Sequence, residues 1–160
     1  MRIGFGYDIH RLEPGRQLKL GGVAIAADFG AVGHSDADVV LHALVDALLG
    51  AAGLGDIGDW FPDNDPQWRG ADSTVFLRET LQRLHEKGFQ VCQADIIIVA
   101  ERPRLGSEKE RIRQRLAELL ALPTDRVNVK AKTNEGLDAL GRGEAIACHA
   151  VAVLRGPKEG

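Results

Sequence analysis

The sequence contains few cysteine and aromatic residues. Its 160 residues include two cysteines and only 5% aromatic side chains. Cys92 and Cys148 lie far apart without CxxC spacing, so we expect reduced, buried thiols in a cytoplasmic protein and no disulfide framework. Because aromatic residues are few, the core must consist mainly of Leu, Val, Ile and Ala.

Neither an excess of positive charge nor a long apolar segment is present. The 20 Lys and Arg residues are outnumbered by 23 Asp and Glu, for a net charge of −3, so the surface as a whole does not attract nucleic acid. The Arg- and Lys-rich segment 108–115 also contains Glu, which is typical of a solvated helix face. No uncharged apolar run reaches the roughly 18 residues of a membrane span, and charge appears too early for a signal peptide.

The length and a hydrophobic content of 44% predict one domain over residues 1–160 with a core of its own. The 19 Gly and 6 Pro residues are many for a helical bundle and indicate numerous turns.

Strand and helix periods alternate along most of the chain. Strands are expected over 2–10, 94–100, 127–133 and 146–154, a hairpin over 17–26 with its turn at Gly21 and Gly22, and helices over 37–52, 73–87 and 107–121. Ser107 and Glu110 form a predicted capping box for the last helix, and the run from Ile96 to Val99 is typical of a strand buried on both faces. This order predicts an α+β fold with two layers, in which a mixed β-sheet has helices packed on one face. The Gly-rich segment 136–143 has no clear pattern.

One predicted helix carries an isolated polar stripe. Between positions 37 and 52 the ionisable residues are Asp38, His42 and Asp46, at i, i+4 and i+8, and therefore on one helix face. The stripe could face solvent or line a cavity. We favour the cavity, because a solvent-facing helix normally also carries Lys and Glu, and because buried ionisable groups need partners.

A first strand supplies possible partners for this stripe. Asp8 and His10 lie two residues apart on that strand, so their side chains emerge on the same face. Together with His42 they make a carboxylate and two imidazoles, the set typical of a catalytic zinc or similar divalent ion with one open position. His85 belongs to a solvated turn and His149 to a terminal strand, so neither is included.

Two other segments have polar residues suited to ligands. His34 and Ser35 precede the helix, where they could cap it or bind a phosphate at its N-terminus. The loop 56–65 contains four Asp residues, which could form turns or accept hydrogen bonds from sugar hydroxyls.

Lys132, Thr133 and Glu135 follow a predicted strand, at the end where open α/β sheets bind ligands. Lys and Thr suit phosphate, and Glu135 suits a second, harder cation such as Mg²⁺.

Several blocks of the sequence, in order along its whole length, resemble the 2-C-methyl-D-erythritol 2,4-cyclodiphosphate synthase family. They are RIGFGYDIHRL, GHSDADVVLHALVDALLGAAGLGDIGDWFPD, IIIVAERPRL, VKAKTNEGL and GRGEAIACHAV. The resemblance implies a phosphorus–oxygen lyase of the non-mevalonate isoprenoid pathway. Its reaction converts 4-diphosphocytidyl-2-C-methyl-D-erythritol 2-phosphate to the 2,4-cyclodiphosphate and CMP, as the 2-phosphate attacks the β-phosphorus with the aid of two divalent metals.

The resemblance also implies roles for individual residues. It places Zn²⁺ on Asp8, His10 and His42, and Mg²⁺ or Mn²⁺ bridging the diphosphate on Glu135. His34 and Thr133 correspond to positions that stabilise the transition state. Substrate contacts are implied for Ser35, Asp56, Ile57, Gly58, Phe61, Pro62, Asp63, Asn64, Asp65, Ala100, Glu101, Arg102, Pro103, Arg104, Leu105, Gly106, Lys132, Asn134, Ala139 and Arg142.

From the polar stripe itself we expect Asp38 and Asp46 to orient the neighbouring ligands. The resemblance further implies a homotrimer with active sites between subunits and an apolar cavity on the threefold axis near Arg142 and Glu144. Ala139 departs from the aromatic residue that some relatives carry there, which bears on any binding of prenyl phosphates in that cavity.

Two other functions fit part of the pattern. A mononuclear zinc phosphohydrolase would use Asp8, His10 and His42 with a bound water and release phosphate or CMP without cyclisation. A non-catalytic module would bind a cytidine nucleotide and a metal without turnover. The co-occurrence of metal, phosphate, sugar and base motifs favours the synthase.

Overall fold

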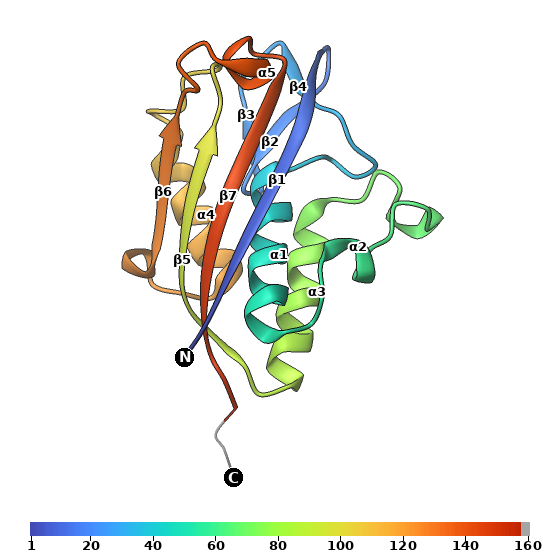
Figure 1. Ribbon diagram of the computed structural model, residues 1–160, viewed down its shortest axis with the longest axis vertical. Coiled ribbons are helices and arrows are strands. Elements are labelled where there is room, and N and C mark those ends of the chain that lie inside the picture. Colours follow the sequence, from blue (N-terminus) through green and yellow to red (C-terminus); the bar gives the residue numbers. More distant parts are fainter. Residues whose placement is uncertain (158–160) are drawn as a thin grey trace.

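The computed structural model describes residues 1–157, which form a mixed five-stranded sheet with helices packed on one of its faces (Figure 1). The sheet has the strand order β4-β1-β7-β5-β6, and β2 pairs with β3 in a separate hairpin. The strands are β1 (Arg2–Pro14), β2 (Leu18–Leu20), β3 (Val23–Ile25), β4 (Phe29–Ala31), β5 (Gln90–Val99), β6 (Val127–Lys132) and β7 (Ala145–Arg155). The helices are α1 (Val39–Ala52), α2 (Ile57–Trp60), α3 (Ser73–Glu86), α4 (Lys109–Leu120), α5 (Asp138–Gly141) and the 3₁₀ helices η1 (Pro66–Trp68) and η2 (Thr124–Arg126).

The predicted mixed sheet is confirmed by the pairing of its strands. β5 and β6 are parallel, and α4 supplies the crossover that a parallel pair requires. β1 and β7 are long antiparallel neighbours at the centre of the sheet, with Asp8 opposite Cys148. No helix within residues 1–157 has both the length and the apolar character needed to cross a lipid bilayer.

Two glycines bring α1 unusually close to β1. Gly4 and Gly6 point toward the helix, and a Cβ atom at either position would overlap the backbone of α1, at Ala47 and Ala43 respectively. Because glycine has no side chain, the helix backbone can lie almost directly on the strand. This contact fixes the height of α1 above the sheet, and α1 is buried almost all round.

The opposite face of the sheet is open. On β1, Ile3, Phe5, Tyr7 and Ile9 are exposed by 72%, 63%, 44% and 43%. The expectation that 94–100 forms a strand buried on both faces is therefore wrong for the single chain. In β5, Ile96 and Ile98 are buried against the helices, whereas residue 97 lies on the open face and is only partly buried.

The start of α1 differs from the prediction. Ala37 has a positive φ of 56°, outside the helical region, so the helix begins at Val39 with Asp38 as its N-cap. The buried Asp38 carboxylate accepts hydrogen bonds from two amides of the first turn and also from the amides of Gly21 and Gly22. One side chain thus caps α1 and ties the β2–β3 turn to it.

Two other local expectations need correction, and one segment without a prediction contains a helix. Ser107 and Glu110 form no capping box, because Glu108 is the N-cap of α4 and makes no side-chain capping hydrogen bond. The amides of Glu108 and Lys109 donate to the Leu105 carbonyl in a backbone turn that leads into the helix. Cys92 is only partly buried, while Cys148 is buried as expected. The Gly-rich segment 136–143 contains the short helix α5.

We expect Gly6→Ala to lower the free energy of unfolding by about 3 kcal/mol or more, because the new methyl group meets a helix backbone that cannot move aside. Gly50→Ala is the matched control within α1, since nothing lies within 4 Å of its added Cβ. It should stabilise the protein by about 0.5–1 kcal/mol through helix propensity. Urea denaturation measures both, and a Gly6→Ala variant as stable as the wild type would contradict the packing described here.

Candidate active site

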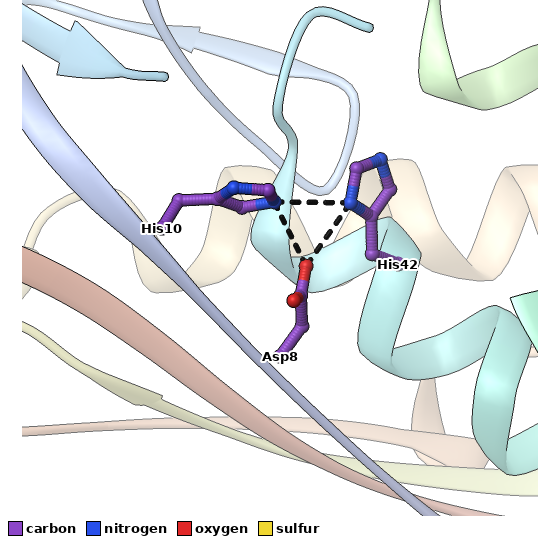
Figure 2. Close-up of side chains that lie close together, drawn as sticks. All are labelled: Asp8, His10 and His42. Carbon is purple, nitrogen blue, oxygen red and sulfur yellow. Dashed lines mark hydrogen bonds and ion pairs between the residues drawn. The ribbon is translucent and has the colours of Figure 1, made fainter. Parts of the chain in front are cut away.

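Asp8, His10 and His42 converge at the contact between β1 and α1 (Figure 2). The Asp8 Oδ2 atom lies 2.9 Å from His10 Nε2 and 3.0 Å from His42 Nδ1, and the two nitrogens are 3.1 Å apart. Asp8 and His10 come from alternate positions of β1, on the face that carries Gly4 and Gly6. The three predicted ligands are therefore brought together by the glycine-mediated contact.

Two of these side chains are oriented by backbone groups on their outer side. Asp8 Oδ1 accepts a hydrogen bond from the Ile9 amide at 2.9 Å, which leaves Oδ2 directed at the imidazoles. His10 Nδ1 lies 2.9 Å from the Val32 carbonyl oxygen. A carbonyl oxygen only accepts, so in the neutral ring Nδ1 carries the proton and Nε2 presents a lone pair toward Asp8.

Burial and hydrogen bonding shift the pKa values of Asp8 and His10. Burial raises the pKa of the Asp8 carboxyl, but the hydrogen bonds and charges of His10 and His42 outweigh it and bring the pKa to about 2. Burial lowers the pKa of His10, whereas the hydrogen bond and charge of Asp8 raise it by more, so the net pKa is raised. Asp8 is thus a carboxylate at neutral pH.

The donor set fits a divalent cation. One carboxylate oxygen and two imidazole nitrogens form a typical three-residue zinc set that leaves a coordination position open. Ligands at about 2.0–2.1 Å from a tetrahedral zinc lie about 3.3 Å apart, close to the distances between these atoms. Three acceptor atoms held near one another repel unless a cation or proton lies between them. A bound metal ion would remove this repulsion.

A cavity of about 480 Å³ opens beside the cluster. Besides the three ligands, its lining contains most of the predicted phosphate and sugar positions: His34, Ser35, Ile57, Gly58, Phe61, Pro62 and Asp63. Asp56, Asn64 and Asp65 are not part of this lining. Asp56 instead caps α2 and Asp65 caps η1, so these carboxylates bind backbone amides of their own loop.

The two remaining members of the polar stripe have partners other than those expected. The hydrogen bonds of the Asp38 carboxylate go to backbone amides of α1 and the hairpin, and none of them reaches Asp8, His10 or His42. Asp46 lines the cavity, and its Oδ1 accepts a hydrogen bond from the Ile57 amide at 2.8 Å. Burial raises the pKa of Asp46, an effect that this hydrogen bond partly offsets. Asp46 thus holds the loop that forms one cavity wall.

The predicted nucleotide residues form a second hollow of about 390 Å³, lined by none of the residues of the first. Its predicted members are Ala100, Glu101, Pro103, Arg104, Leu105, Gly106, Lys132 and Thr133. Arg102 is not among them, because its guanidinium lies over the Phe29 ring, 4.8 Å from the ring centroid. His34 and Thr133, both predicted to act on the transition state, therefore belong to different hollows of the chain.

Glu135 lies near the second hollow and outside the Asp8–His10–His42 group. It adopts a positive φ of 53°, and its carboxylate accepts a hydrogen bond from the Thr133 hydroxyl at 3.4 Å. The backbone amide of Asn134 donates a hydrogen bond to the Glu101 carboxylate at 3.3 Å. Arg142 and Ala139 line a third hollow together with Arg102, and Arg142 forms a two-contact ion pair with Glu144.

Sequence reasoning missed three side chains of the site. Trp68 and Phe76 line the cavity and pack edge-to-face against each other. Ser73, interpreted from the sequence only as the start of a helix, places its hydroxyl 2.9 Å from His42 Nε2. The segment GADS that precedes the helix resembles an ordinary capping sequence, so the pattern alone could not distinguish this role.

Comparisons with known proteins show which family the chain belongs to. Residues 1–155 match the YgbB family, and the chain belongs to this family. Its similarity to the 2-C-methyl-D-erythritol 2,4-cyclodiphosphate synthase of Symbiobacterium thermophilum reaches 54% identity, over 98% of this chain and 99% of that protein.

Solved structures agree with the fold. A structure of 2C-methyl-D-erythritol-2,4-cyclodiphosphate synthase is 47% identical, with a TM-score of 0.90 over 96% of this chain and all of that one. A second structure of such a synthase, described as the form bound to CDP, is 46% identical, with a TM-score of 0.89 and coverage of 96% and 100%. The family resemblance expected from the sequence motifs is therefore confirmed.

His42→Ala should remove one of three ligands and weaken Zn²⁺ binding by more than about 100-fold. His85→Ala is the matched control, because His85 is exposed at the end of α3, away from the cluster, and its loss should leave binding unchanged. Equilibrium dialysis with elemental analysis gives the zinc content per chain. Equal zinc affinity in the His42→Ala variant and the wild type would exclude the cluster as the binding site.

Proposed function

We propose that the chain converts 4-diphosphocytidyl-2-C-methyl-D-erythritol 2-phosphate to 2-C-methyl-D-erythritol 2,4-cyclodiphosphate and CMP, as a metal-dependent phosphorus–oxygen lyase. The observation that carries this proposal is the convergence of Asp8, His10 and His42 at a cavity that also contains the expected phosphate and sugar residues. Relatives named as this synthase, at 54% identity over nearly the whole chain, support the same reaction.

In this proposal Asp8, His10 and His42 hold one Zn²⁺ per chain. Glu135 would hold a Mg²⁺ or Mn²⁺ that neutralises charge on the diphosphate. Bound divalent ions supply Lewis-acid chemistry that neutralises phosphate oxygens and favours in-line displacement. Asp8 supplies the one anionic side chain of this proposed zinc site.

The residues around the cavity bind and orient the substrate. His34 and Ser35 lie in the loop before α1 and suit the 2-phosphate, while Asp63 can accept hydrogen bonds from hydroxyl groups of the erythritol. The attacking group is a phosphate oxygen and already an anion, so the reaction needs no protein nucleophile. It forms one bond to the β-phosphorus and breaks the bond from that phosphorus to the CMP oxygen. Holding the attacking oxygen in line with its target is the main contribution of these side chains.

The second hollow suits the nucleotide end of the substrate. Ala100 to Gly106 offer backbone groups for the cytosine base, and Lys132 and Thr133 offer a charge and a hydroxyl for the diphosphate. The solved synthase structure described as bound to CDP supports a cytidine diphosphate as the ligand of such a chain.

We further propose that the active protein is a homotrimer. The metal-side and nucleotide-side residues line separate hollows of one chain, so a neighbouring chain could bring the two halves of the site together. The open sheet face, with Ile3, Phe5, Tyr7 and Ile9 exposed on β1, offers an apolar surface for that contact. Exposed apolar side chains that lie together on one face are typical of a protein–protein contact.

Phosphorus NMR of the reaction tests the proposed chemistry. With the substrate and Mg²⁺, the wild type should yield two mutually coupled phosphorus resonances from the cyclic diphosphate, together with that of CMP. A hydrolase would give CMP without a new P–O–P linkage, and a binding module would leave the substrate unchanged; either result excludes the proposal. Asp8→Asn is the inactive control, because it weakens the charge that holds the cation.

Mixing two inactive variants tests the shared site. Co-expression of His42→Ala with Lys132→Ala in equal amounts should restore about a quarter of wild-type activity, since one site in four then combines two intact halves from different chains. Each variant alone should remain inactive. If both hollows that form a site came from the same chain, the mixture would stay as inactive as its components.

A further inference from the structure

The outer nitrogen of His42 contacts two hydroxyl groups whose positions differ. His42 Nε2 lies 2.9 Å from Ser73 Oγ and 3.1 Å from Ser35 Oγ. Ser73 is completely buried and is not part of the cavity lining, whereas Ser35 lines the cavity. Ser73 is therefore the partner that a bound substrate cannot displace.

Asp36 determines which atom is the donor in the hydrogen bond between Ser73 and His42. Its Oδ1 accepts hydrogen bonds from both the amide and the hydroxyl of Ser73, and its Oδ2 accepts one from Lys19 Nζ at 3.2 Å. A carboxylate beside an ammonium group only accepts. The Ser73 hydroxyl proton thus points to Asp36, and the Ser73 oxygen is left to accept a proton from His42 Nε2.

This assignment determines which nitrogen of His42 can bind a metal. With its proton on Nε2, the ring presents an unprotonated Nδ1 to Asp8 Oδ2, 3.0 Å away. We propose that Ser73 is a positioning residue for the metal centre, because its hydroxyl, oriented by Asp36, fixes the tautomer and the angle of the His42 ring. The inference rests on the metal site of the proposed function and adds to it two residues that do not touch the ion.

The backbone around this chain of hydrogen bonds holds it in place. The Asp36 amide donates to the Ala71 carbonyl at 3.0 Å, and the Gly70 amide donates to the His34 carbonyl at 2.7 Å. Lys19 also bonds the Asp72 carboxylate, the N-cap of α3, at 2.9 Å. The loops that carry Asp36 and Ser73 are thus joined at several points, so Ser73 cannot move independently of the loop before α1.

The same arrangement leaves Ser35 available to a ligand. Its oxygen accepts a hydrogen bond from the Ala37 amide at 3.2 Å, while Ser73 satisfies His42. With the Ser73 proton on Asp36, the Ser35 hydroxyl donates to Ser73 Oγ, 3.3 Å away. Because Ser35 also lines the cavity, its hydroxyl can turn to donate to a ligand there instead. The two serines near His42 accordingly have separate tasks, one toward the metal ligand and the other toward the anionic substrate.

The test is Zn²⁺ affinity, measured by competition with a chelator on purified, metal-free protein. Ser73→Ala should weaken binding about 10- to 100-fold and change the visible spectrum of the Co²⁺-substituted protein, and Ser73→Thr, which keeps the hydroxyl, should restore both. Thr80→Val is the matched control in the same helix. Its hydroxyl is buried and has no hydrogen-bond partner within residues 1–157, so Zn²⁺ affinity should equal that of the wild type.

Metal-free unfolding midpoints separate positioning from stability. The inference holds if Ser73→Ala weakens binding while remaining folded, and it is overturned if its affinity stays within about twofold of the wild type. Should Ser73→Ala not fold, Asp36→Asn decides: weakened binding supports the inference and unchanged binding overturns it. A wild type that binds no Zn²⁺ would refute the proposed metal site itself. If the wild type and the Ser73→Ala variant bind Zn²⁺ equally well, only the role of Ser73 is refuted.

Discussion

The close contact of α1 with β1 determines the geometry of the whole site. Gly4 and Gly6 allow the helix backbone to lie on the strand, and the next two residues on the same strand face are Asp8 and His10. His42 is one turn into the helix that rests there. Metal ligands must be placed to within about 0.2 Å, a tolerance smaller than the displacement that one added methyl group would cause. The contact between α1 and β1 therefore both packs the core and places the ligands.

The acidic residues near the site differ in what they bind, although the sequence makes them appear alike. The Asp8 carboxylate faces two imidazoles, whereas those of Asp38 and Asp46 face backbone amides that anchor the hairpin and a cavity wall. Asp36 bonds a hydroxyl group and an ammonium group. A net charge of −3 therefore does not mean a uniformly acidic pocket, because most of these carboxylates are already engaged by donors.

Local periodicity was sufficient to predict the long strands and helices and the clustering of Asp8, His10 and His42. Alternation on β1 placed Asp8 and His10 on one face, and the apolar surroundings of His42 marked it as a buried polar group in need of partners. The role of Ser73 could not be predicted, because its contact with His42 joins positions that are distant in sequence. The Ser107 capping box failed because α4 begins one residue later than predicted, with Glu108 as its N-cap and a backbone turn leading into it. The open face of β5 was missed because an apolar run does not reveal whether the covering layer belongs to the same chain.

The alternation of β1 has an evolutionary consequence. Residues 3, 5, 7 and 9 face outward, while the two glycines and the two ligands face α1. Substitutions on one face can accumulate largely independently of those on the other, since side chains on opposite faces do not touch. A single-residue insertion or deletion would exchange the two faces, putting apolar side chains against the helix and the ligands on the outside. The length of this strand is therefore more strictly constrained than its composition.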